Sequence, residues 1–168
     1  KRKIYQQLAD WKLVSNGKSA LLIEGARRIG KSYIVEQFAK QEYKSYILID
    51  FNNVKTEIKN LFLNYLTDLD TLFQLLSLHT NVQLHPRESV IIFDEVQQLP
   101  PARAAIKYLV ADGRYDYIET GSLIRIKKNV QNIVIPSEEQ HLNMYPMDFE
   151  EFLWAMGEHA LCNYICEC

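Results

Sequence analysis

The sequence lacks the features that mark membrane-spanning, secreted and strongly basic proteins. Its 168 residues contain no apolar run long enough to cross a bilayer, and no hydrophobic stretch of signal-peptide type follows the basic residues 1–3. Lys and Arg number 19 against 21 Asp and Glu, so the formal net charge is −2 and overall charge gives no support to general nucleic-acid affinity. We therefore expect a cytoplasmic protein without membrane attachment.

Cysteine is scarce and is confined to one end of the chain, at Cys162, Cys166 and Cys168. An odd number argues against a closed set of disulfides, and the spacing is not the C-x-x-C pair of common zinc sites, although His159 lies nearby. A metal site and a tail without a fold of its own are the two alternatives, and we favour the tail.

Internal repeats and low-complexity segments are also absent. The length suits one domain with a substantial core, and 48% hydrophobic with 24% charged residues is ordinary for a soluble globular protein.

The chain contains a regular alternation of strand-like and helix-like apolar patterns. Strand patterns fall at 20–24, 45–51, 90–93, 115–120 and 141–145, and helical patterns fall at 4–11, 33–39, within 54–78 with a break near 67–68, at 100–112 and at 148–157. This order predicts an α/β fold in which helices cover both faces of a parallel sheet.

Residues 25–32 match the pattern G-x-x-x-x-G-K-[ST], the Walker A phosphate loop, between a predicted strand and a predicted helix. Such a loop points backbone N–H groups at phosphate oxygens, and the helix that follows presents its positive end to the same anion. The lysine adds a charge for the β- and γ-phosphates, and the hydroxyl can ligate Mg²⁺. We expect a nucleoside triphosphate to be bound by Gly25, Ala26, Arg27, Arg28, Ile29, Gly30, Lys31, Ser32 and Tyr33.

Polar residues follow two further predicted strands, where a ligand is expected at the carboxyl edge of a parallel sheet. Asp94 and Glu95 follow an apolar run in the Walker B arrangement: Asp94 would hold Mg²⁺ with Ser32, and Glu95 would activate a water. A solvated turn or a helix cap is the alternative for this acidic pair. Thr120 and Ser122 would sense the γ-phosphate or position the water, or else bond the local backbone of a tight turn. The predicted catalytic residues are thus Lys31, Glu95, Thr120 and Ser122, and the predicted metal ligands are Ser32 and Asp94.

Basic residues outside these motifs have less definite roles. Arg27 and Arg28 either contact a phosphate or the base, or lie on the surface. An arginine near the γ-phosphate would accelerate hydrolysis strongly, and Arg125 is the best-placed candidate, ahead of Arg103 and Arg114. The pair at 127–128 could touch nucleic acid, but a two-residue cluster is usually solvated surface.

Four motifs in this order resemble the N-terminal ATPase domain of prokaryotic AAA-type ATPases that carry a DUF4143 C-terminal domain. They are the loop at 25–32, F-D-E-V-Q at 93–97, T-G-S at 120–122 and Y-P-M-D-F-E-E-F at 145–152. The resemblance implies a P-loop NTPase with a five-stranded parallel sheet in the order 5-1-4-3-2. It also implies ATP and Mg²⁺ as ligands, ADP as product, Thr120 to Ser122 as the sensor 1 region, and assembly into a homo-oligomer.

The chain departs from that family pattern in two places. A Gly-Arg pair that often precedes the last strand is replaced by P-S-E-E-Q at 136–140, which removes a plausible arginine finger. The second departure is length, because the 168 residues do not include the usual C-terminal domain. We therefore expect residues 1–157 to form the ATPase domain and residues 158–168 to be a short cysteine-containing tail left by truncation.

The leading hypothesis from the sequence is an ATPase that hydrolyses ATP with Mg²⁺ to drive a conformational change. The first alternative is a nucleotide-dependent binding switch with negligible hydrolysis, which works through a protein or nucleic-acid partner. A small-molecule kinase with a lid over 125–131 ranks lowest, because the acidic pair at 94–95 points to water as the acceptor. The absence of a guanine-reading Asn-Lys-x-Asp motif favours ATP over GTP.

Overall fold

The structure is a computed structural model that describes residues 3–25, 30–122 and 139–143. Helices and strands alternate along most of this length, as the apolar patterns predict. The described elements are helix α1 (Lys3–Ser15), strand β1 (Ala20–Glu24), helix α2 (Lys31–Glu42), strand β2 (Ser45–Asp50), helix α3 (Thr56–Asn64), helix α4 (Leu69–Thr80), strand β3 (Ser89–Asp94), the short 3-10 helix η1 (Val96–Gln98), helix α5 (Pro100–Asp112), strand β4 (Asp116–Gly121) and strand β5 (Glu139–Asn143).

The strands form one parallel sheet in the order β2-β3-β4-β1-β5. Read from the opposite edge, the order is β5-β1-β4-β3-β2. The chain leaves β1 for the far edge at β2, returns through β3 and β4, and reaches β5 on the other side of β1. The carboxyl ends of β1, β3 and β4 therefore meet at the same edge of the sheet, where three of the predicted motifs lie.

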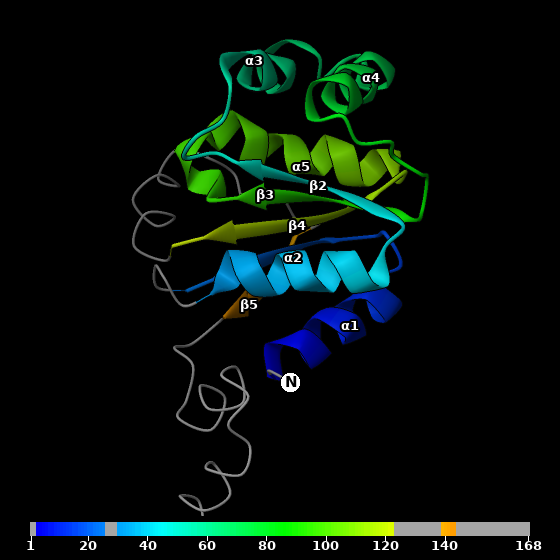
Figure 1. Ribbon diagram of the computed structural model, residues 1–168, viewed down its shortest axis with the longest axis vertical. Helices are drawn as coiled ribbons and strands as arrows, with labels where there is room; N and C mark the ends of the chain where they lie inside the picture. Colours follow the sequence, from blue (N-terminus) through cyan, green and yellow to red (C-terminus); the bar gives the residue numbers. More distant parts are fainter. Residues whose placement is uncertain (1–2, 26–29, 123–138, 144–168) are drawn as a thin grey trace, which may run out of the picture.

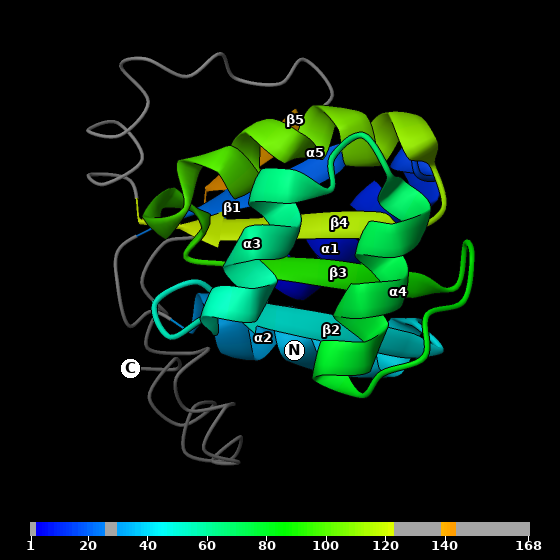
Figure 2. The ribbon, with the colours of Figure 1, turned by 90° about the horizontal axis from the view of Figure 1, so that it is seen from above.

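Helices cover both faces of the sheet, with α1 and α2 on one side and α3, α4 and α5 on the other (Figures 1 and 2). Each face has its own apolar core, because alternate residues of each strand point to opposite sides. On the α5 side, the rings of Phe51, Phe62 and Phe93 meet edge to face at centroid distances of 5.3 to 6.0 Å. On the α2 side, Phe38 packs in the same way against Tyr5 and Tyr43. The α/β class with helices on both sides of a parallel sheet is confirmed.

The predicted break between the two central helices has a specific chemical cause. Asp68 precedes α4, where its Oδ1 accepts a hydrogen bond from the backbone N of Thr71 at 3.3 Å. Its Oδ2 accepts a second bond from the Thr71 hydroxyl at 2.6 Å. The first bond satisfies a backbone donor that the first helical turn leaves without a partner, and the second holds the Asp68 side chain in place, so a new helix begins at Leu69. Helix α5 has the expected ends: it begins at Pro100 and is closed by Gly113 in the left-handed conformation (φ 78°).

Strand boundaries differ from the expected ones by one or two residues. Strand β5 begins at Glu139, two residues earlier than its alternating pattern indicates, because all five residues of β1 pair with it from Ala20↔Glu139 to Glu24↔Asn143. Strand β4 runs from Asp116 to Gly121 rather than over 115–120. Residues 144 and 145 and the helix expected at 148–157 lie outside the described residues.

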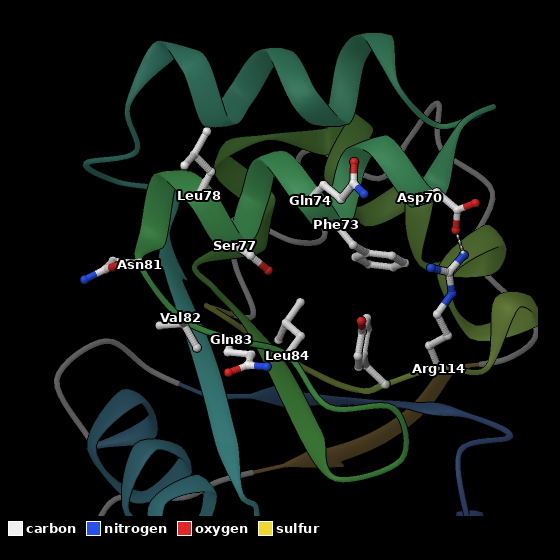
Figure 3. Close-up of a pocket in the computed structure, with 11 residues that line it drawn as sticks. Asp70, Phe73, Gln74, Ser77, Leu78, Asn81, Val82, Gln83, Leu84 and Arg114 are labelled. Carbon is white, nitrogen blue, oxygen red and sulfur yellow. Dashed lines mark ion pairs between the residues drawn. The ribbon is translucent and has the colours of Figure 1, made fainter.

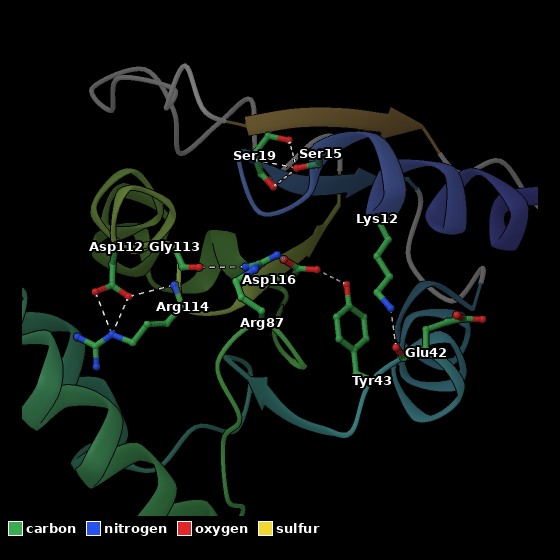
Figure 4. Close-up of polar contacts among 10 residues, drawn as sticks. All are labelled: Lys12, Ser15, Ser19, Glu42, Tyr43, Arg87, Asp112, Gly113, Arg114 and Asp116. Carbon is green, nitrogen blue, oxygen red and sulfur yellow. Dashed lines mark hydrogen bonds and ion pairs between the residues drawn. The ribbon is translucent and has the colours of Figure 1, made fainter.

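A polar network joins several elements at the amino ends of the strands (Figure 4). Asp116, at the start of β4, is 5% exposed and accepts hydrogen bonds from Arg87 Nη2 at 2.8 Å and from the Tyr43 hydroxyl at 2.5 Å. Arg87 also donates to the carbonyl oxygen of Gly113 at 3.0 Å. Burial and the neighbouring carboxylate raise the pKa of Tyr43, so its hydroxyl stays a donor. The network ties the end of α2 to the starts of β3 and β4.

Candidate functional site

The predicted phosphate loop, acidic pair and hydroxyl residues all lie at the carboxyl edge of the sheet. The register pairs Glu24 with Gly121, and Gly25 donates its backbone N–H to the Gly121 carbonyl oxygen at 3.2 Å. The β3–β4 register pairs Phe93 with Glu119, so the residues that follow those strands are neighbours as well. Topology therefore brings together three groups that are far apart in the sequence.

The phosphate loop connects β1 to α2 as its motif predicts. Gly30 precedes α2 in the left-handed conformation (φ 86°), which glycine adopts without the steric cost that a side chain would add. Lys31 is 4% exposed, and its Nζ donates to the Gly25 carbonyl oxygen at 2.8 Å. The ammonium is thus held against the first residue of the loop. The remaining loop residues, Ala26, Arg27, Arg28 and Ile29, lie outside the described residues.

Ser32 and Asp94 are in direct contact, as a shared metal site requires. The Ser32 hydroxyl donates to Asp94 Oδ1 at 2.6 Å, although 62 residues separate the two in the chain. Asp94 is the last residue of β3 and is 7% exposed. Burial raises the pKa of its carboxyl group, while the hydrogen bonds from Ser32 and Thr120 oppose that rise. A hydroxyl and a carboxylate oxygen are the hard ligands that Mg²⁺ prefers.

Thr120 links the two acidic residues through a single hydroxyl. Its Oγ1 donates to Asp94 Oδ1 at 2.6 Å and accepts from the backbone N of Glu95 at 3.0 Å. The side chain is completely buried, so both hydrogen-bonding functions of the hydroxyl are used inside the protein. Thr120 therefore bonds the acidic pair, and its role towards the γ-phosphate or the water stays a prediction.

Glu95 has a backbone conformation that the sequence did not indicate. It is left-handed (φ 56°, ψ 51°), which is uncommon for a residue with a side chain and typical of functional sites. Its Oε2 accepts hydrogen bonds from Gln97 Nε2 at 2.5 Å and from the Ser122 hydroxyl at 3.5 Å. Ser122 therefore lies beside Glu95, and its catalytic role stays a prediction. Sequence reasoning gave no role to Gln97, although the F-D-E-V-Q motif contains it.

Tyr33 lies in the first turn of α2, beside Ser32, and is 68% exposed. Helix α2 is amphipathic, with Ile34, Val35 and Phe38 facing the core, so the exposed position of Tyr33 follows from the helical period.

Of the arginines considered as partners for the γ-phosphate, one is buried, one is paired at the opposite edge of the sheet, and one lies outside the described residues. Arg103 is 2% exposed within α5. Arg114 precedes β4 at the opposite edge of the sheet and forms ion pairs with Asp70 at 2.6 Å and Asp112 at 3.1 Å. Arg125, the basic pair at 127–128, His159 and the three cysteines lie outside the described residues.

A hollow of about 760 Å³ lies near the amino ends of the strands, between α4 and the segment that leads into β3 (Figure 3). Phe73 and Tyr115 meet edge to face at 4.8 Å, and the Arg114 guanidinium lies 5.1 Å from the centre of the Phe73 ring. Among the described residues that line it, Arg114 is the only cation and is paired with Asp70, so this lining offers no unpaired positive charge to a phosphate. Its lining residues are Asp70, Phe73, Gln74, Ser77, Leu78, Asn81, Val82, Gln83, Leu84, Arg114 and Tyr115.

Comparison with known protein families agrees with the geometry at the carboxyl edge. Residues 17–153 match the family described as AAA domain, which covers more than half of the chain. The chain belongs to this AAA domain family. The match includes the phosphate loop, the acidic pair at 94–95 and the T-G-S segment, and it supports a nucleotide-binding, ATPase-like function. A search of curated proteins found no match. No described helix of this AAA domain is long and apolar enough to span a membrane.

Proposed function

We propose that this AAA domain hydrolyses ATP with the help of Mg²⁺ and uses the reaction to change its conformation. The observation that carries the proposal is a continuous hydrogen-bonded chain beside the phosphate loop. It runs from Ser32 to Asp94, from Asp94 to Thr120, and from Thr120 to the backbone of Glu95. A metal ligand pair and a candidate base are thereby fixed relative to each other, which is the pre-organisation that phosphoryl transfer needs.

Each residue has a distinct role in this proposal. Lys31 would release the Gly25 carbonyl and bind the β- and γ-phosphates, and Glu95 would accept the proton of the attacking water. Thr120 and Ser122 would hold Glu95 in place rather than touch the phosphate, since their hydroxyls bond the acidic pair. The nucleotide would be held by Gly25, Ala26, Arg27, Arg28, Ile29, Gly30, Lys31, Ser32 and Tyr33.

The residues present fit a magnesium ion. Mg²⁺ in nucleotide sites takes one or two protein oxygens and completes its shell with water and phosphate oxygens. Ser32 Oγ and Asp94 Oδ1 already lie 2.6 Å apart and offer those oxygens. When bound, the ion would neutralise charge that develops on the phosphates.

The proposal is tested by phosphate release from ATP and Mg²⁺, measured for the wild type and for Glu95→Gln. Glutamine keeps the shape of the side chain but cannot take a proton, so we expect nucleotide binding to persist and turnover to fall by at least 100-fold, on the order of a lost general base. Glu36→Gln, on the exposed side of α2, is the matched control and should leave the rate unchanged. Full turnover by Glu95→Gln would refute the role of Glu95.

A nucleotide-dependent binding switch is the second candidate, and the arginines favour it. Among the described residues, Arg87 and Arg114 lie at the opposite edge of the sheet, and Arg103 is only 2% exposed, so no described arginine offers the nucleotide an exposed guanidinium at the carboxyl edge. Hydrolysis would then be slow until another chain, a homo-oligomer neighbour or a protein or nucleic-acid partner completes the site. Binding without turnover in the same assay would support this candidate. A cytoplasmic location remains part of the proposal.

A further inference from the structure

Gln97 is a buried side chain in the site that the nucleotide-binding motifs leave without a role. Its Nε2 donates to Glu95 Oε2 at 2.5 Å, and the residue is only 3% exposed. The neighbouring Gln98 has the same side chain but is exposed to solvent. The chain therefore holds one glutamine against the proposed base and turns the next one away from the core.

The backbone explains why residue 97 can reach residue 95. Glu95 is left-handed and precedes the 3-10 helix Val96–Gln98, whose first bond runs from the Gln98 N to the Glu95 carbonyl oxygen at 3.0 Å. This tight turn folds the side chain two positions later back towards the carboxylate. The left-handed conformation is unfavourable for a residue other than glycine. Thr120 accepts the Glu95 N–H at 3.0 Å, and Val96 is completely buried, so the turn is held on both sides.

The two oxygens of Glu95 are not equivalent in this arrangement. Oε2 accepts from both Gln97 Nε2 and Ser122 Oγ, whereas Oε1 has no hydrogen bond to any residue that the structure describes. We propose that Gln97 is a positioning residue that fixes Oε2 and so presents Oε1 to the attacking water. The inference rests on the proposed function, because it gives a task to Gln97 only if Glu95 acts on water.

The test compares Gln97→Met with the matched control Gln98→Met. Methionine has nearly the volume of glutamine and suits a buried position, but it cannot donate a hydrogen bond. We expect Gln97→Met to lower kcat about tenfold, the effect of one lost orienting contact, and to change KM less than about twofold. Gln98→Met should match the wild type in both. In the Glu95→Gln background, Gln97→Met should lower the residual rate less than about twofold, because the two residues act as one unit.

A second measurement does not depend on turnover or on the folding of a Gln97 variant. The side-chain amide resonances of Gln97 in a ¹⁵N-labelled wild-type protein should shift when Glu95 is changed to Ala, and those of Gln98 should not. Resonances of Gln97 that stay in place would overturn the inference. So would wild-type kcat in Gln97→Met while Glu95→Gln is inactive, and this result leaves the proposed function standing. No turnover by the wild type at all would instead overturn the proposed hydrolysis, and the role of Gln97 with it.

Discussion

Replacing Thr120 with valine tests whether one hydroxyl holds the acidic pair together. Valine has nearly the same shape, so the substitution removes hydrogen bonds without leaving a large cavity. The hydroxyl donates to Asp94 Oδ1 at 2.6 Å and accepts from Glu95 N at 3.0 Å, and the side chain is completely buried. A bond to a carboxylate contributes about 1.5 to 3 kcal/mol, and a buried N–H without a partner costs about 1 to 3 kcal/mol. We therefore expect the free energy of unfolding to fall by about 3 kcal/mol.

Thermal unfolding of the nucleotide-free protein measures this change. For 168 residues, an unfolding entropy of about 2.1 cal/mol/K per residue converts 3 kcal/mol into a drop in Tm of about 8 °C. Thr120→Ser keeps the hydroxyl and should lose about 1 kcal/mol for its missing methyl group. Thr67→Val, at an exposed position, is the control for valine itself and should change stability by less than about 0.5 kcal/mol. A Thr120→Val protein as stable as Thr67→Val would refute the bridging role of the hydroxyl.

Three further predictions concern Asp94 and the network at the opposite edge. Mg²⁺ binding needs the ionised carboxyl group of Asp94, and the pKa of this group is raised. As pH is lowered, the affinity for Mg²⁺ should therefore begin to fall at a higher pH than it would with an aspartate of ordinary pKa. Titrations of Mg²⁺-dependent nucleotide binding over a pH series measure this. Because burial raises the pKa of Asp94 in the folded state, this group favours the folded nucleotide-free protein most below its unfolded pKa, and that contribution is lost as pH rises through the folded pKa. Arg87→Met removes the ion-pair partner of the buried Asp116 and should lower the free energy of unfolding, measured by urea denaturation, by about 1 to 3 kcal/mol. Asp116→Asn in the double variant should restore part of this loss. Wild-type stability in Arg87→Met would contradict the prediction. Gly17→Ala should lower the free energy of unfolding more than Gly113→Ala. Both glycines have positive φ, but only a Cβ on Gly17 would lie 2.5 Å from Arg87 Nη1. Equal losses of stability in the two variants would show that the guanidinium moves aside freely.

The sheet and its helices could be predicted from the sequence because their signals are local. An apolar run such as 90–93 is buried on both faces, the period of 3.6 in α2 separates exposed Tyr33 from buried Ile34, and Asp68 is a recognisable cap. The end residues of the strands could not be predicted from local signals, because the partner strand decides where pairing stops. The start of β5 at Glu139 is set by the length of β1.

The phosphate loop, Asp94 and Glu95 could also be predicted, because their motifs fix residue types at fixed spacing. The contacts between them could not. That Thr120 bonds both Asp94 and Glu95 depends on the pairing of β3 with β4, and the reach of Gln97 to Glu95 depends on a left-handed backbone that no residue type at position 95 indicates. The network of Arg87, Asp116 and Tyr43 likewise joins residues from three elements whose proximity exists only in the folded sheet.

The most direct test of the account is a calorimetric titration of the protein with ATP and Mg²⁺, with Lys31→Ala and Lys40→Ala as paired variants. Both lysines lie on α2, but Lys31 is buried against the phosphate loop and Lys40 is exposed and pairs with Glu36. The account predicts that the wild type and Lys40→Ala bind the nucleotide alike and that Lys31→Ala binds at least about tenfold more weakly, since a cation on the phosphates is lost. Equal binding by Lys31→Ala, or no binding by the wild type, would contradict the placement of the nucleotide at the carboxyl edge of the sheet.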